Sequence, residues 1–116
     1  MPLVVAELQA AVDAEAARIT WYSLHTADPG TTGTSEVTGG IPAYARKQTT
    51  WGAANTSGVA AGSQVTFDVP ATTVTHVGFW SASTAGTFRG SINVTDEVFA
   101  AQAQYLFTPT LDGDTA

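Results

Sequence analysis

The sequence contains no cysteine, only four basic residues and no long hydrophobic run. The lack of cysteine excludes disulfide frameworks, cysteine-based zinc sites and thiol nucleophiles, and it leaves the redox compartment open. The four basic residues stand against ten acidic ones, for a formal net charge of −6. Because nucleic-acid binding requires clustered lysine and arginine, this balance argues against nucleic acid as a partner. No apolar run approaches the roughly 18 residues of a membrane span, so no membrane partner is expected either.

The overall size and composition indicate one soluble globular domain. A length of 116 residues fits a single domain, and a hydrophobic fraction of 44% is that of a folded protein. Charged residues make up only 12%, whereas alanine and threonine supply 39 residues. Uncharged polar side chains must therefore keep much of the surface hydrated. The first residues lack the basic segment of a secretion signal and soon reach Glu7, so no export address is expected.

One segment near the amino terminus has the periodicity of a helix, which we predict over residues 3–18 within an amino-terminal unit 1–18. Its apolar residues recur at three- and four-residue steps. They are Val4 or Val5, Leu8, Val12, Ala16 and Ile19. The stripe is interpreted as a packing face, since the polar side carries no lysine cluster that would suit a membrane. Because such a stripe fits either this chain's own sheet or a partner's groove, four of its residues are interface candidates. These are Val4, Val5, Leu8 and Val12.

From Ile19 onward the residues favour β-structure, because β-branched and aromatic side chains alternate with polar ones. Strands are predicted over 19–26, 44–51, 64–69, 73–80 and 88–94, with a last one through 105–107 that Pro109 interrupts. Segment 73–80 is apolar on both faces towards its end, which is typical of a central strand. Residues 27–43 form a long connection, and residues 52–62 form an irregular crossover or a weak edge strand.

These elements predict a mainly β fold. We expect a single antiparallel β-sandwich, jelly-roll-like, with six to seven short strands over residues 19–111 and one amino-terminal α-helix. Residues 112–116 are expected to be a frayed tail.

Residues for catalysis or metal binding are sparse. His25 and Asp28 are one possible metal pair. The alternative, which we favour, is a strand histidine bonded to a backbone carbonyl, with Asp28 forming the turn before Pro29. His76 has no carboxylate nearby in the sequence, and the acidic pairs are interpreted as solvated charges. The sequence also lacks a Gly-x-Ser-x-Gly elbow and a glycine-rich phosphate loop. We therefore predict a protein without enzymatic activity, catalytic residues, bound metal or cofactor.

The tryptophans and the one basic pair are more informative. Trp80 is assigned to the core, whereas Trp51 is the tryptophan expected to be partly exposed, as an interface anchor or a sugar-stacking ring. Arg46 and Lys47 form the only basic pair. They are interpreted either as partners for an acidic neighbouring subunit or as a solvated strand edge that blocks aggregation. Trp51, Arg46 and Lys47 complete the set of interface candidates.

Three blocks of the sequence resemble a pattern found in tailed bacteriophages. They are residues 22–33 continuing to 36–40, residues 42–47 continuing to 50–54, and residues 74–80 with 86–90. Over residues 19–94 the chain resembles the small tail-fibre, minor-tail and head-fibre (decoration) proteins of phages that infect actinobacteria. The carboxyl-terminal third departs from that pattern, which leaves the register of the last strand open.

The resemblance implies a non-enzymatic virion component that is β-rich, homo-oligomeric and assembled in the host cytoplasm. We expect a surface-displayed tail-fibre or minor-tail component, bound through the helix or through the loop 27–43. One alternative is a capsid decoration protein that binds the major capsid protein. A further alternative is a carbohydrate-binding module that contacts a host cell-wall glycan. The expected partners are accordingly copies of the chain, tail or capsid proteins and, in the last case, a surface glycan.

Overall fold

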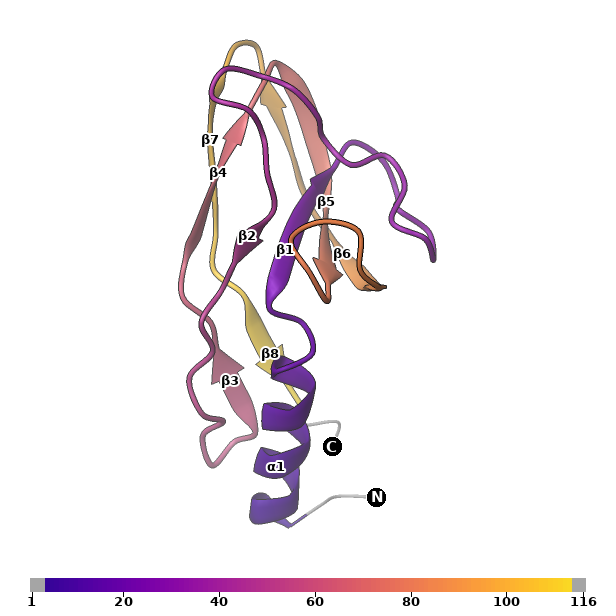
Figure 1. Ribbon diagram of the computed structural model, residues 1–116. Coiled ribbons are helices and arrows are strands. Elements are labelled where there is room, and N and C mark those ends of the chain that lie inside the picture. Colours follow the sequence, from indigo (N-terminus) through magenta and orange to yellow (C-terminus); the bar gives the residue numbers. More distant parts are fainter. Residues whose placement is uncertain (1–3, 114–116) are drawn as a thin grey trace.

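The computed structural model describes residues 4–113 and confirms a mainly β chain with one helix (Figure 1). The helix α1 spans Val5–Ala16. The strands are β1 (Trp21–His25), β2 (Lys47–Gln48), β3 (Val59–Ala61), β4 (Val65–Val69), β5 (Thr72–Trp80), β6 (Phe88–Phe99), β7 (Ala103–Phe107) and β8 (Thr110–Asp112). The molecule is elongated, with extents of 47 × 24 × 24 Å. No helix in the described part of the chain is long and apolar enough to cross a membrane.

The upper half of the molecule in Figure 1 is a small β-sandwich, as the sequence predicts. A four-stranded antiparallel sheet in the order β2-β1-β5-β6 packs against the two-stranded antiparallel pair β4–β7. The core between them consists of Tyr22, Leu24, Val37, Val65, Phe67, Val69, Val74, Val77 and Phe99. In β4 the predicted alternation is confirmed, because Val65, Phe67 and Val69 are buried and the residues between them are not.

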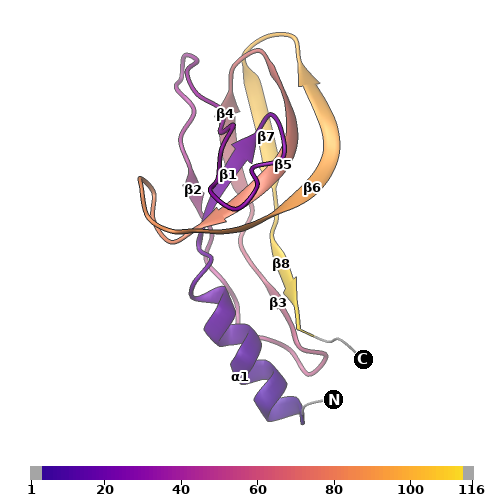
Figure 2. The same cartoon turned by 90° about the vertical axis from the view of Figure 1, so that its right-hand side faces the viewer.

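The helix and the short pair β3–β8 form the opposite end of the molecule (Figures 1 and 2). Val12 packs there with Ala54 and Ala60 in a second cluster. Both polar groups of Ala54 bind the helix: the Gln9 side-chain amide donates to its carbonyl at 3.1 Å, and its N–H donates to Asp13 Oδ1 at 2.8 Å. The helix is therefore fixed to the segment before β3 by both apolar packing and hydrogen bonds.

Several predicted element boundaries are wrong. The strand predicted over 44–51 is reduced to β2, and Trp51 forms only an isolated bridge with Gly62. The strand predicted to end at 94 continues to Phe99 because β5 offers pairing partners along that length. Among the described residues there are eight strands rather than six or seven, because the interruption at Pro109 separates β7 from a further strand, β8.

The carboxyl-terminal tail also differs from the expectation. Asp112 belongs to β8, which pairs with β3 in the segment expected to be an irregular crossover. This pairing buries Ala60 completely and so orders residues whose own sequence has little periodicity. The helix begins at Val5 rather than at residue 3. Residues 1–3 and 114–116, which include parts of the predicted helical unit and tail, lie outside the described residues.

Candidate functional site

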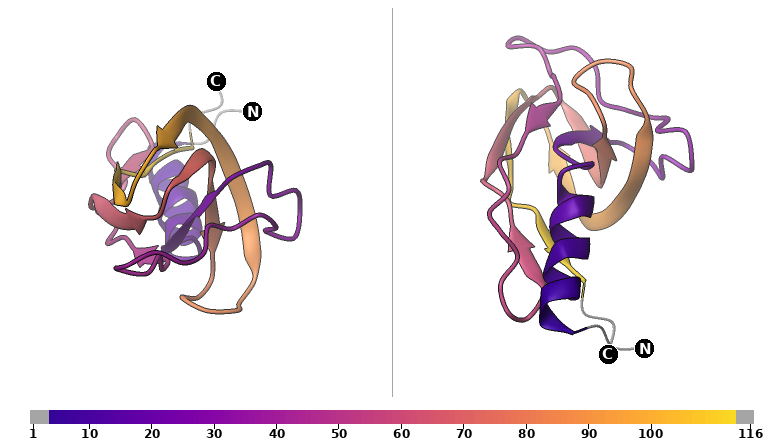
Figure 3. Two further views of the ribbon diagram at one scale, coloured as in Figure 1. Left: turned by 90° about the horizontal axis from the view of Figure 1, so that it is seen from above. Right: turned by 60° about the horizontal axis from the view of Figure 1, so that its bottom comes forward.

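Strand β1 is buried on both faces, and its second face carries a polar network. Tyr22 and Leu24 point into the sandwich core, whereas Ser23 and His25 point away from it, yet both are 0% exposed. They are covered by the first part of the long loop that follows β1, residues 27–36, which lies on the side of the four-stranded sheet away from β4 and β7 (Figure 3). The structure therefore places polar side chains where a two-layer sandwich would ordinarily face solvent.

A glycine in the neighbouring strand makes room for this network. Gly78 of β5 lies directly opposite Ser23. A Cβ atom at Gly78 would lie 2.6 Å from both His25 Nε2 and Ser23 Oγ, and 3.0 Å from the Phe88 ring. Such distances are well inside van der Waals contact, so only glycine fits this position without displacing the polar side chains.

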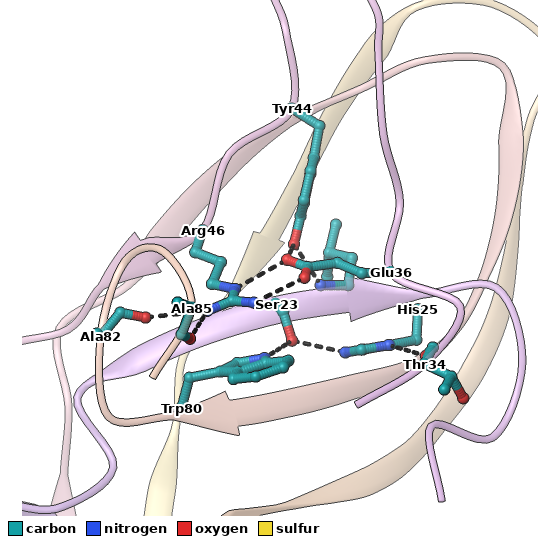
Figure 4. A network of polar contacts seen from close by, with 10 residues as sticks. Ser23, His25, Thr34, Glu36, Tyr44, Arg46, Trp80, Ala82 and Ala85 are labelled. Carbon is teal, nitrogen blue, oxygen red and sulfur yellow. Dashed lines mark hydrogen bonds and ion pairs between the residues drawn. The ribbon is translucent and has the colours of Figure 1, made fainter. Parts of the chain in front are cut away.

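The hydrogen bonds around His25 fix the state of its ring (Figure 4). His25 Nδ1 lies 2.7 Å from the carbonyl oxygen of Thr34, which can only accept, so Nδ1 carries the hydrogen. His25 Nε2 then accepts from the Ser23 hydroxyl at 2.6 Å, and Ser23 Oγ accepts from the indole N–H of Trp80 at 2.8 Å. The result is one directed chain of hydrogen bonds from Trp80 to the backbone of the long loop.

These contacts decide between the two interpretations of His25. The histidine bonds a backbone carbonyl, and Asp28 Oδ1 accepts from the N–H of Gly30 at 2.8 Å, which confirms the turn that the sequence indicates. No group of three or more metal-ligating side chains exists in the part of the chain that the structure describes. The contact between Ser23 and His25 resembles a nucleophile and its base. Both are fully buried, however, so in this arrangement they link the sheet to the loop.

Arg46 forms the second half of the network. Its guanidinium lies over the Trp80 ring, 3.5 Å from the ring centroid. Nε and Nη2 donate to the two carboxylate oxygens of Glu36, each at 3.0 Å, and the side chains of this pair are only 10% and 21% exposed. Nη1 donates to the carbonyls of Ala82 and Ala85 in the β5–β6 hairpin loop, at 3.1 and 2.9 Å. One guanidinium therefore joins the long loop, the strand β5 and the hairpin loop.

Tyr44 connects this ion pair to β1. Its hydroxyl donates to Glu36 Oε2 at 2.8 Å and accepts from the backbone N–H of Leu24 at 2.9 Å. Burial, and then the negative charge of Glu36, raise the pKa of Tyr44 well above its ordinary value, so the phenol remains a hydrogen-bond donor. The Tyr44 ring also stacks on Phe67, with 6.1 Å between ring centroids. The network is thereby attached to the sandwich core.

The interface candidates from the sequence do not gather in one place. Val4 and Val5 are exposed at the helical end, Leu8 is partly exposed, and Val12 is buried under the chain's own β3–β8 end. Arg46 forms its ion pair inside the chain, and Lys47 is a partly buried residue of β2 opposite Tyr22.

Trp80 and Trp51 lie as the sequence indicates, and Trp21 is partly exposed as well. Trp80 is buried at 7% exposure, while Trp51 is partly exposed. The Trp51 indole donates to the carbonyl of Ile19 at 3.3 Å and packs against both apolar clusters. Sequence reasoning found neither the Glu36–Arg46 pair nor the role of Gly78, because the residues are far apart in the chain and share no periodicity.

We expect the stability of the protein to fall as the pH drops below about 6.5. Desolvation by burial lowers the pKa of His25 below its ordinary 6.5, and this outweighs the opposing effects of the Thr34 carbonyl and Glu36. The unfolded chain then binds a proton at a pH where the folded chain does not. One such group lowers the free energy of unfolding by at most about 1.4 kcal/mol for each pH unit below 6.5. Above pH 7.5, His25 causes no loss of stability.

Denaturant unfolding between pH 7.5 and 5 measures this dependence. His25→Gln cannot titrate and should flatten the pH profile between 6.5 and 5.5, whereas His76→Gln should leave it steep. Equal profiles for the two variants would show that His25 is not the group responsible.

One known protein family matches most of the chain. The family model described as Podophage GP4 fiber I protein gp80 matches residues 6–105. The matched range contains the complete polar network, strands β1 to β6 and the first part of β7. No curated protein and no solved structure gives a significant match. The phage-fibre part of the resemblance is confirmed, and the actinobacterial host stays a prediction. The chain belongs to the podophage GP4 fiber I protein gp80 family and is a structural fibre protein of the virion.

Proposed function

We propose that this fibre protein is a surface-displayed tail-fibre or minor-tail component, attached to its virion partner through the helical end of the molecule. One observation carries this proposal: the apolar stripe of α1 extends beyond the surface that the chain itself covers. Val12 and Ala16 are buried at 3% and 2% exposure, whereas Val4 and Val5 are 69% and 47% exposed. Two neighbouring exposed valines can bind in an apolar groove of another protein.

The side of the sandwich that carries the polar network suits display (Figure 1). There the polar network fixes the long loop and the β5–β6 hairpin loop to the same sheet. A shallow pocket of about 350 Å³ lies between these loops, lined by residues that include Thr38, Ser83 and Thr84. A rigid, hydroxyl-rich and weakly charged surface of this kind supports contacts with further copies of the chain or with other virion proteins.

The helical anchor fits a second candidate equally well. A capsid decoration protein would use Val4 and Val5 to bind the major capsid protein instead of a tail protein. The carbohydrate-binding alternative has less support. It expects a second ring beside Trp51, but among the described residues no aromatic pair includes Trp51.

The proposal is tested by replacing the exposed valines and not the whole helix. Deleting residues 1–18 would also remove Val12 from the second cluster and so disturb the fold. The double variant Val4→Ser, Val5→Ser should stay folded and yet reduce incorporation into particles at least tenfold, because two apolar side chains would be missing from the contact.

The matched control is Val98→Ser, Leu106→Ser, two valine-sized or larger side chains exposed at 74% and 58% elsewhere in the molecule. Incorporation is measured by the amount of the protein in purified particles. Binding to isolated tails supports the fibre assignment, and binding to isolated heads supports decoration. Equal incorporation of the two double variants would reject the helical end as the anchor.

A further inference from the structure

A cavity of about 280 Å³ lies on the flank of the sandwich, separate from the polar network and from the exposed valines. Its large side chains come from the linker before β1, from both layers of the sandwich and from β8. They are Ile19, Tyr22, Phe79, Ile92, Phe107 and Leu111. Such an apolar cavity that opens to the surface is a binding site for a small apolar group.

One polar group in this cavity has no protein partner. Tyr22 is 1% exposed, and its hydroxyl makes no hydrogen bond to any residue that the structure describes. In the described part of the chain, every fully enclosed side-chain N or O atom has a hydrogen-bond partner, so the unbonded Tyr22 hydroxyl must keep a small exposed area. Tyr22 lines the cavity, and we infer that its hydroxyl is exposed there. Its ring is held by Phe79 and Phe107, at centroid distances of 5.5 and 5.8 Å. Burial raises the pKa of Tyr22, which keeps the phenol protonated.

The strands beside the cavity have unpaired edges. β6 is the last strand of the four-stranded sheet, and in the described part of the chain β7 pairs only with β4. Both strands line the cavity, β6 through Ile92 and β7 through Phe107. Figure 2 shows β6 curving away from β7 below the turn that connects them. Free backbone donors and acceptors next to an apolar cavity are the features that bind an extended peptide.

We propose that this cavity binds one aromatic side chain, presented by an extended segment of a neighbouring virion protein. Its volume exceeds the roughly 150 Å³ that holds benzene and is below the roughly 300–1,000 Å³ of pockets for drug-sized ligands. The Tyr22 hydroxyl favours a tyrosine or tryptophan, whose polar atom can complete a hydrogen bond. The net charge of −6 disfavours a second copy of the chain and favours a neutral or basic segment.

Small analogues of aromatic side chains test the site itself. In methyl NMR titrations, 4-methylphenol and toluene should shift the methyl signals of Ile19, Ile92 and Leu111, and leave those of Val98 and Leu106 unchanged. 4-Methylphenol should bind about fivefold more tightly than toluene because it can hydrogen-bond Tyr22. Tyr22→Phe should abolish that difference. Unchanged cavity signals would overturn the site, and equal affinities for the two probes in the wild-type protein would overturn the role of the hydroxyl.

A substitution that fills the cavity tests the partner. Ile92 is 42% exposed, so Ile92→Trp can turn its ring inward, and Val98→Trp is a control on the same strand outside the cavity. Ile92→Trp should lose probe binding and fall at least tenfold in incorporation into particles, whereas Val98→Trp should keep both. Loss of probe binding with normal incorporation would overturn the protein partner and leave a free small molecule as the ligand. The Val4→Ser, Val5→Ser variant should still bind 4-methylphenol, which separates this site from the helical anchor.

Discussion

Replacing Glu36 with glutamine is expected to lower the free energy of unfolding by about 3 kcal/mol. The substitution keeps the shape of the side chain but leaves the Arg46 guanidinium without a counter-charge over the Trp80 ring. Removing one partner of a buried ion pair costs about 3–5 kcal/mol, and the 21% exposure of Glu36 places this case at the lower end. Urea unfolding at pH 7.5 measures the change.

The chain contains a matched control for this experiment. Glu15 and Arg18 form an ion pair at 3.7 Å with side chains that are 48% and 59% exposed. Glu15→Gln should therefore change the stability by less than about 0.5 kcal/mol. Adding Arg46→Met to Glu36→Gln should recover part of the loss, because the uncompensated charge is then gone. Equal losses for Glu36→Gln and Glu15→Gln would contradict the importance of the buried pair.

Gly78→Ala is expected to cost roughly 3 kcal/mol, through overpacking and through the loss of a buried hydrogen bond. The new methyl group would lie 2.6 Å from both Ser23 Oγ and His25 Nε2, and these two atoms cannot separate without breaking their own contact. The measurement is again urea unfolding. Proton NMR of the Trp80 indole N–H should show, in addition, the loss of its bond to Ser23.

Gly52→Ala is the control for the glycine substitution. A Cβ atom there would meet only the carbonyl oxygen of Ala61, at an ordinary 3.5 Å, and the backbone is not in the left-handed region. Its stability should stay within about 0.5 kcal/mol of the wild type. A tolerated Gly78→Ala, with stability equal to that of Gly52→Ala, would show that the polar network can relax and does not require glycine.

The sequence was sufficient to predict those elements that depend only on residues close together in the chain. The alternation of β4 depends on neighbouring residues, and so does the turn at Asp28 before Gly30, so both could be predicted. The double burial of β5 could also be predicted, because apolar residues occur on both faces near its end. The sandwich follows from the number and spacing of such segments.

The remaining features depend on pairs of residues that only the fold brings together. The strand β3 consists of small residues without periodicity, and it forms because β8, about fifty residues later, offers backbone partners. For Arg46 the sequence indicates only a neighbouring subunit or a solvated strand edge, because its partners in the fold, Glu36 and the carbonyls of Ala82 and Ala85, lie in separate loops. A single sequence contains no signal for such contacts, since no regular spacing connects the residues.

The attachment of both loops by their bases has a consequence for how this protein can vary. The carbonyl of Thr34 and the side chains of Glu36 and Arg46 hold the loops in place, while Thr31, Thr32, Ser83 and Thr84 at the tips are exposed. Substitutions at these four positions can therefore change the chemistry of the exposed loop tips without changing where the loops lie on the sheet.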